Sequence, residues 1–150
     1  MIYDRSMFNI PDSMKMGHTG PLICAGITAY TPLNRFVKDK KDQQHVGIIG
    51  FGGLGRMAVK NAKVMEQKWQ FSLIVWRRKS KQRGWGVSAC VCHGDAGLME
   101  SMERSIDAIP DPISIGHEVV HMISTLKVGG TYCFLGGVPE PVKISAIVAP

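Results

Sequence analysis

The chain has 150 residues, 45% of them hydrophobic, and a formal net charge of +6. This length suits about one domain with a buried core, and no apolar run approaches the roughly 18 residues that a membrane span requires. The N-terminus lacks the charged-then-apolar pattern of a secretion signal, and the four cysteines show no disulfide-framework spacing. We therefore expect a cytoplasmic globular protein with reduced thiols.

The first 37 residues are rich in proline, glycine and turn-forming residues. Within them, the apolar segment 21–30 suits a buried helix. The polar segment 38–44 (KDKKDQQ) is typical of a surface loop. The apolar run 45–50 that follows is typical of a buried parallel strand, and 56–65 has the apolar periodicity of a helix.

The glycines Gly50, Gly52 and Gly55 stand between this strand and this helix, in the pattern G-x-G-x-x-G. In a dinucleotide-binding turn the first glycine permits the tight turn and the second lets the backbone approach a pyrophosphate. The third lets the helix pack on the strand, and the helix N-terminus supplies N–H groups and a partial positive charge. The pattern alone is a weak signal, but here both flanks are of the required type, so dinucleotide binding is predicted.

The alternation continues, with strands expected at 71–76, 90–92 and 131–135 and helices expected at 97–104 and 118–126. Another strand is expected within 106–115, where Pro110 and Pro112 should damage a central strand because proline cannot donate to the ladder. Gly129 and Gly130 should end the helix before the last strand. Alternating strands and helices predict an α/β fold, a doubly wound parallel sheet.

Several segments resemble, in order and spacing, the cinnamyl-alcohol-dehydrogenase-like branch of the zinc-dependent medium-chain alcohol dehydrogenases. They are 10–12 (IPD), 21–33 (PLICAGITAYTPL), 46–60 (VGIIGFGGLGRMAVK), His117 within ISIGHEV, 126–131 (LKVGGT) and 135–141 (LGGVPEP). The resemblance implies a Rossmann-type NADP(H)-binding fold in an enzyme that reduces aldehydes or oxidises alcohols. It also implies that residues 1–20 are the tail end of the catalytic (GroES-like) domain and 21–150 an incomplete NADP-binding domain.

The resemblance also assigns roles to individual residues. Cys24 matches a ligand of the catalytic zinc, although by itself it would be interpreted as a small buried hydrophobic residue. Thr28 matches a residue near the nicotinamide. The pyrophosphate turn would comprise Gly50, Gly52, Gly53, Leu54 and Gly55, and backbone near the carboxamide would come from Gly137 and Val138.

The remaining zinc ligands of the family would lie before Ile10, and the structural zinc cluster is missing too. The chain is therefore expected to be a truncated fragment, inactive by itself, of a parent enzyme whose family is typically homodimeric. The sequence identifies neither the substrate nor the oligomeric state, and leaves open whether the chain itself is an enzyme.

Residues 66–86 depart from the family pattern. This window holds six basic residues, one acid and all three tryptophans. One hypothesis is a one-base deletion near the codon of Met65, compensated near Ser88, so that 66–88 is frameshifted and the chain is a poorly folding, non-catalytic remnant. Another is a basic nucleic-acid-binding module, with interleaved aromatic residues.

The same window bears on the choice of coenzyme. No Asp or Glu occurs between Gln67 and Gly94, which disfavours NAD because an acid after the second strand normally binds the ribose hydroxyls. Arg77 could contact the 2′-phosphate of NADP, although a solvated basic loop also explains it.

Two further groups resemble metal sites. His117 and His121 are four residues apart and would lie on one face of the expected helix, but without a third ligand such a pair is usually helix surface. Cys90, Cys92 and His93 offer soft ligands at a spacing unlike that of a structural zinc site.

Overall fold

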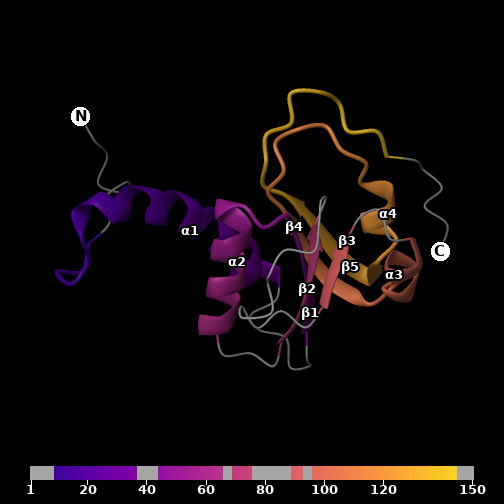
Figure 1. The fold of residues 1–150 in the computed structure, drawn as a ribbon, viewed down its shortest axis with the longest axis horizontal. Helices are drawn as coiled ribbons and strands as arrows, with labels where there is room; N and C mark the ends of the chain where they lie inside the picture. The colour runs from indigo at the N-terminus through magenta and orange to yellow at the C-terminus, as the bar shows by residue number, and fades with distance from the viewer. Residues whose placement is uncertain (1–8, 37–43, 66–68, 76–88, 93–95, 145–150) are drawn as a thin grey trace.

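Five parallel strands form one sheet in the order β3-β2-β1-β4-β5 (Figure 1). The computed structural model describes residues 9–36, 44–65, 69–75, 89–92 and 96–144; for 69–75, 89–92, 96 and 98 only the backbone is described. The strands are β1 (Gln44–Ile49), β2 (Trp69–Val75), β3 (Ala89–Cys92), β4 (Ile106–Asp111) and β5 (Leu126–Phe134). The helices are α1 (Met16–Phe36), α2 (Gly53–Val64), α3 (Ala96–Ser101) and α4 (Val120–Ile123).

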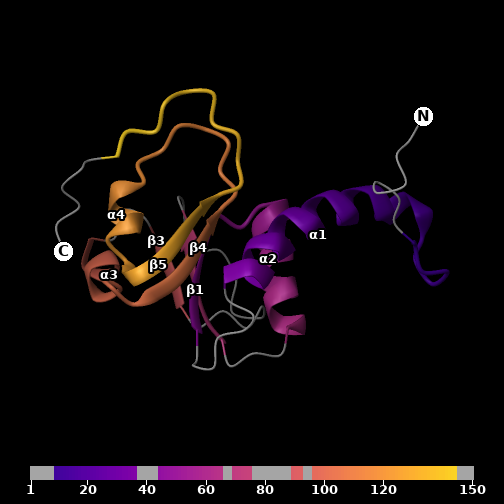
Figure 2. The same ribbon diagram turned by 180° about the vertical axis from the view of Figure 1, so that it is seen from behind.

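The helices lie on both faces of this sheet. In Figures 1 and 2, α1 and α2 lie on one side, and α3 and α4 lie on the other. The chain runs outward from β1 through β2 to β3, then crosses back to place β4 against the other side of β1. The predicted α/β doubly wound parallel sheet is confirmed, and its strand order reverses between β1 and β4.

β1 is the centre of the core. Val46, Ile48 and Ile49 are at most 1% exposed, because both faces of a central parallel strand are covered. Val46 and Ile48 pack with Ala58 and Val59 of α2, whereas Ile49 belongs to the cluster on the opposite face. The predicted run 45–50 is thus confirmed as a buried strand.

α1 is longer than the predicted segment and only partly buried. Ala29, Pro32 and Leu33 are buried near its C-terminal end, whereas Leu22, Ile27 and Tyr30 are exposed. The expectation that 21–30 forms a buried helix is therefore correct in type and wrong in burial. No helix in the described part of the chain combines the length and hydropathy that a membrane span requires.

The region 118–135 differs most from the prediction. The expected helix 118–126 is reduced to α4, and β5 begins at Leu126. Between the pairs Ile106↔Leu126 and Ala108↔Thr131, β5 advances five residues while β4 advances two. The glycines expected to end the helix, Gly129 with φ +78° and Gly130, therefore lie inside β5 at this irregularity.

The expected strand forms as β4, with Pro110 inside it. The prediction that prolines damage this strand is correct only for its ladder with β1, which is a single residue pair. β4 pairs with β1 at Val46↔Ala108 and with β5 as far as Asp111↔Phe134. A proline removes one ladder donor, and the burial of Ile106 and Ile109, both 0% exposed, holds the strand in place.

His45, at the start of β1, gives the fold a predicted pH dependence. Its Nδ1 donates to the carbonyl oxygen of Ser105 at 3.0 Å, and its backbone N donates to the Asp107 carboxylate at 2.8 Å. Burial lowers the pKa of His45 below its ordinary value of 6.5; the Ser105 hydrogen bond opposes this, Lys127 adds to it, and Asp107 opposes it.

The folded state therefore disfavours protonated His45. Its contribution to stability is present above the unfolded pKa of 6.5 and is lost as the pH falls toward the lower folded pKa. We expect His45→Gln to reduce the loss of unfolding free energy between about pH 7.5 and about pH 5, measured by urea denaturation. An equal loss in the variant and the unchanged protein would contradict this.

Candidate functional site

The carboxyl ends of β1 and β4 lie side by side at one edge of the sheet, where the strand order reverses. Ligands of open α/β sheets bind in the crevice at such a switch point. Gly50 follows β1 there with φ +74°, a left-handed conformation that favours glycine. The first glycine of the predicted turn thus makes the tight bend that its position requires.

Gly55, the third glycine, allows α2 to pack against this turn. A Cβ on Gly55 would lie 2.1 Å from the carbonyl oxygen of Gly50, closer than any real contact. The residue is buried in the first turn of α2. The glycine pattern therefore fixes where the helix starts relative to the end of β1.

The space in front of this turn is open. A Cβ on Gly52 or Gly53 would meet no atom within 4 Å. Gly52 is the N-cap of α2 and provides no side-chain cap for the first helical N–H groups. An anion can approach the backbone here and meet the positive end of a 12-residue helix.

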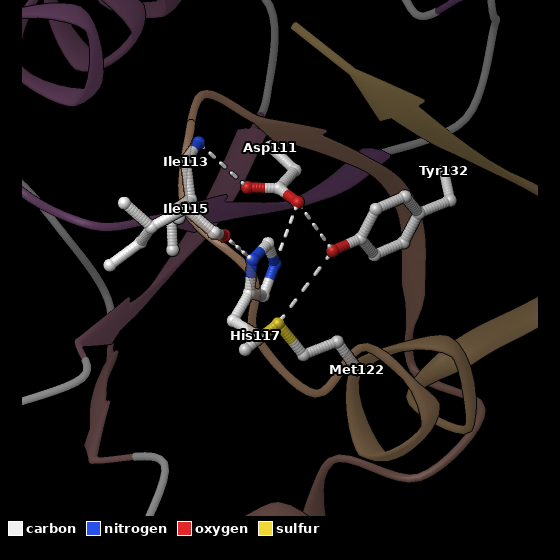
Figure 3. Close-up of polar contacts among 6 residues, drawn as sticks. All are labelled: Asp111, Ile113, Ile115, His117, Met122 and Tyr132. Atoms are coloured by element: carbon white, nitrogen blue, oxygen red, sulfur yellow. Dashed lines mark hydrogen bonds and ion pairs between the residues drawn. The ribbon is translucent and has the colours of Figure 1, made fainter. Parts of the chain in front are cut away.

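A buried polar cluster lies at the end of the neighbouring strand β4 (Figure 3). The Asp111 carboxylate, in a residue that is 0% exposed, accepts from Ile113 N at 3.0 Å and from the Tyr132 hydroxyl at 2.9 Å. His117 Nε2 lies 2.9 Å from Asp111 Oδ2. The two atoms are close enough for an ion pair, but their geometry is not that of a well-aligned hydrogen bond. Burial raises the pKa of Tyr132, and the negative charge and hydrogen bond of Asp111 raise it further, so the hydroxyl keeps its proton.

Sequence reasoning did not single out Asp111, and it interpreted His117 differently. His117 precedes α4 and faces Asp111, whereas His121 faces Glu118 at 3.5 Å on the surface. The two histidines therefore do not lie on the same helix, and they face different acidic side chains. Asp111 is the last residue of β4, and an acid at the end of an expected strand is the sequence signal that could have identified it.

The other predicted site residues whose positions the structure describes lie in two places. Cys24 and Thr28 lie on α1, where the Thr28 hydroxyl donates to the Cys24 carbonyl oxygen at 2.9 Å. Cys24 is exposed, so its interpretation as a buried hydrophobic residue is wrong. Gly137 and Val138 follow β5 at the carboxyl edge of the sheet, and Arg77 lies outside the described residues.

No metal site is formed within the described ranges, because no group of three His, Cys, Asp or Glu residues comes together there. The side chains of Cys90, Cys92 and His93, and the window 76–88, lie outside the described residues.

The chain is similar to several plant enzymes. It is 34% identical over 137 residues to vomilenine reductase of Rauvolfia serpentina, a match that covers 89% of this chain and 37% of that protein. It is 35% identical over 145 residues to a putative cinnamyl alcohol dehydrogenase of Oryza sativa subsp. japonica, which covers 96% of this chain and 40% of that protein. The chain is homologous to the cinnamyl-alcohol-dehydrogenase-like zinc-dependent medium-chain dehydrogenases. No protein-family model matches it.

Solved structures of such dehydrogenases have the same fold. A cinnamyl alcohol dehydrogenase of Sorghum bicolor superimposes with a TM-score of 0.83 at 29% identity, over 93% of this chain and 40% of that chain. The CAD of Helicobacter pylori, complexed with NADP(H), superimposes with a TM-score of 0.73 at 25% identity, over 93% of this chain and 39% of that one. The chain thus spans about two fifths of the length of these relatives.

Proposed function

We propose that this chain is the coenzyme-binding part of an NADP(H)-dependent alcohol or aldehyde oxidoreductase. The observation that carries the proposal is the turn from Gly50 to Gly55, which lies at the switch point of a doubly wound sheet with open space before Gly52. In this proposal Gly50, Gly52, Gly53, Leu54 and Gly55 surround the pyrophosphate. Gly137 and Val138 present backbone to the nicotinamide end, with Thr28 nearby.

NADP(H) is favoured over NAD(H) by the charge of the segment that contains β2. The absence of acids between Gln67 and Gly94 leaves no carboxylate there for the ribose hydroxyls. Arg77 follows β2 and supplies a cation suited to a 2′-phosphate. The complex of the Helicobacter pylori relative with NADP(H) supports the same choice.

The described residues do not by themselves fit a catalytic zinc. Cys24 is exposed, and no cluster of three potential ligands occurs in the described ranges, whereas a catalytic zinc takes three protein ligands. We expect no alcohol or aldehyde turnover from the purified chain alone; zinc-dependent aldehyde reduction by it would contradict this.

Thermal denaturation tests coenzyme binding directly. A ligand that binds only the folded state stabilises it by about 2.7 kcal/mol at a hundredfold excess over its Kd, which raises the Tm by roughly 5–10 °C for a domain of this size. We expect NADPH to raise the Tm and NADH at the same concentration to raise it less. An unchanged Tm in saturating NADPH would overturn the proposal.

A further inference from the structure

The two loops that leave the carboxyl edge after β4 and β5 are joined through Asp111. Its backbone oxygen accepts from Leu135 N at 2.8 Å and from Gly136 N at 3.3 Å. A Cβ on Gly136 would lie 2.1 Å from the carbonyl oxygen of Ile113, so the loops touch backbone to backbone. In Figure 1 they run together beyond the edge of the sheet.

The carboxylate of Asp111 adds contacts to the loop after β4 and to β5 itself. Through Ile113 N and His117 it holds the loop after β4, and through the Tyr132 hydroxyl it holds β5 (Figure 3). A buried carboxylate needs hydrogen-bond donors in place of the water that would otherwise surround it. With donors on both oxygens, its orientation and the positions of those donors are fixed together.

His117 extends the cluster back to its own loop. The imidazole side chain is 2% exposed, and its Nδ1 lies 2.9 Å from the carbonyl oxygen of Ile115. Its two ring nitrogens thus face two oxygens, that of Ile115 in its own loop and that of Asp111 at the end of β4. The imidazole therefore links its loop to Asp111.

We propose that Asp111 is a positioning residue: together with His117 and Tyr132 it locks loops 112–117 and 135–137 into one platform for the nicotinamide half of the coenzyme. Asp111 is fully buried and acts through the loops rather than by touching the ligand. The assignment to the nicotinamide half rests on the proposed function, in which Gly137 and Val138 lie at that end. The glycine turn after β1 would hold the pyrophosphate independently of this lock.

Asp111→Asn tests the proposal, and Asp107→Asn is its matched control. Both acids lie on β4, but Asp107 is near the opposite edge of the sheet, where it accepts from His45 N and Lys127 Nζ, each at 2.8 Å. In Asp111→Asn we expect the affinity for NADPH to fall roughly tenfold or more. The affinity for adenosine 2′,5′-bisphosphate, a probe of the adenine half, should change less than about twofold. Asp107→Asn should change neither.

Amide hydrogen exchange tests the lock without any ligand. The Ile113 and Leu135 amides should exchange faster in Asp111→Asn than in Asp107→Asn, with the amides of β1 unchanged. If Asp111→Asn does not fold, Tyr132→Phe removes a single donor, and Tyr30→Phe, on exposed Tyr30, is its control.

The outcomes separate the two proposals. Equal losses of NADPH and adenosine 2′,5′-bisphosphate affinity, or unchanged exchange at Ile113 and Leu135, would overturn the positioning role. If the unchanged chain binds neither ligand, the coenzyme proposal and the assignment to its nicotinamide half fail together, and faster exchange in the variant would support the lock alone.

Discussion

Gly55→Ala is expected to be among the most damaging single-methyl additions to this fold. The new Cβ would lie 2.1 Å from the Gly50 carbonyl oxygen and 3.1 Å from its carbonyl carbon. These are backbone atoms between β1 and α2, so neither can turn away as a flexible side chain would. We expect the free energy of unfolding, from urea denaturation, to fall by about 1–3 kcal/mol or more, which lowers the Tm by roughly 2–4 °C per kcal/mol.

Gly52→Ala is the matched control, because the same methyl group would enter open space. Gly52 has φ −79° and ψ −160°, an extended conformation that alanine adopts without strain. Stability should stay within about 0.5 kcal/mol of the unchanged chain. Affinity for NADPH should nevertheless fall, because the methyl group would stand between the backbone and the pyrophosphate. Similar stability losses in Gly52→Ala and Gly55→Ala would contradict the packing role of Gly55.

The sequence predicted the part of the fold around β1 well because local and tertiary forces agree there. The apolar residues of β1 are covered on both faces. The glycines can adopt the turn that the strand and helix require. Periodicity, turn chemistry and burial therefore all indicate the same strand-turn-helix unit.

Agreement between local and tertiary forces ends in the second half of the chain. Residues 118–126 have an amphipathic pattern, yet Leu126 is paired with Ile106 and begins β5. The pairing that decides this comes from residues about twenty positions away, which a local window does not include. Pro110 is the converse case, because burial on both sides keeps a strand that local propensity disfavours.

The two parts of the candidate site also differ in how far the sequence could predict them. The glycine turn was visible because its residues are contiguous and each has a geometric role. The Asp111 cluster was not, because its donors come from Ile113, His117 and Tyr132, on two segments that only the β4–β5 pairing brings together.

His117→Leu is expected to destabilise the Asp111 cluster. It leaves the Asp111 carboxylate, 0% exposed, without the imidazole that faces it at 2.9 Å. Leaving a buried polar group without one of its partners typically costs about 1–3 kcal/mol. Urea denaturation of the variant measures the loss.

A second substitution distinguishes the loss of the contact with Asp111 from the loss of side-chain packing. Asp111→Asn should destabilise the His117→Leu variant less than it destabilises the unchanged chain, since the contact between the two side chains is already absent there. The two losses would thus not add, as expected when the two groups act as a pair. Additive losses in the double variant would instead mean that His117 contributes to stability mainly through its volume, with Asp111 held by Tyr132 and the Ile113 amide alone.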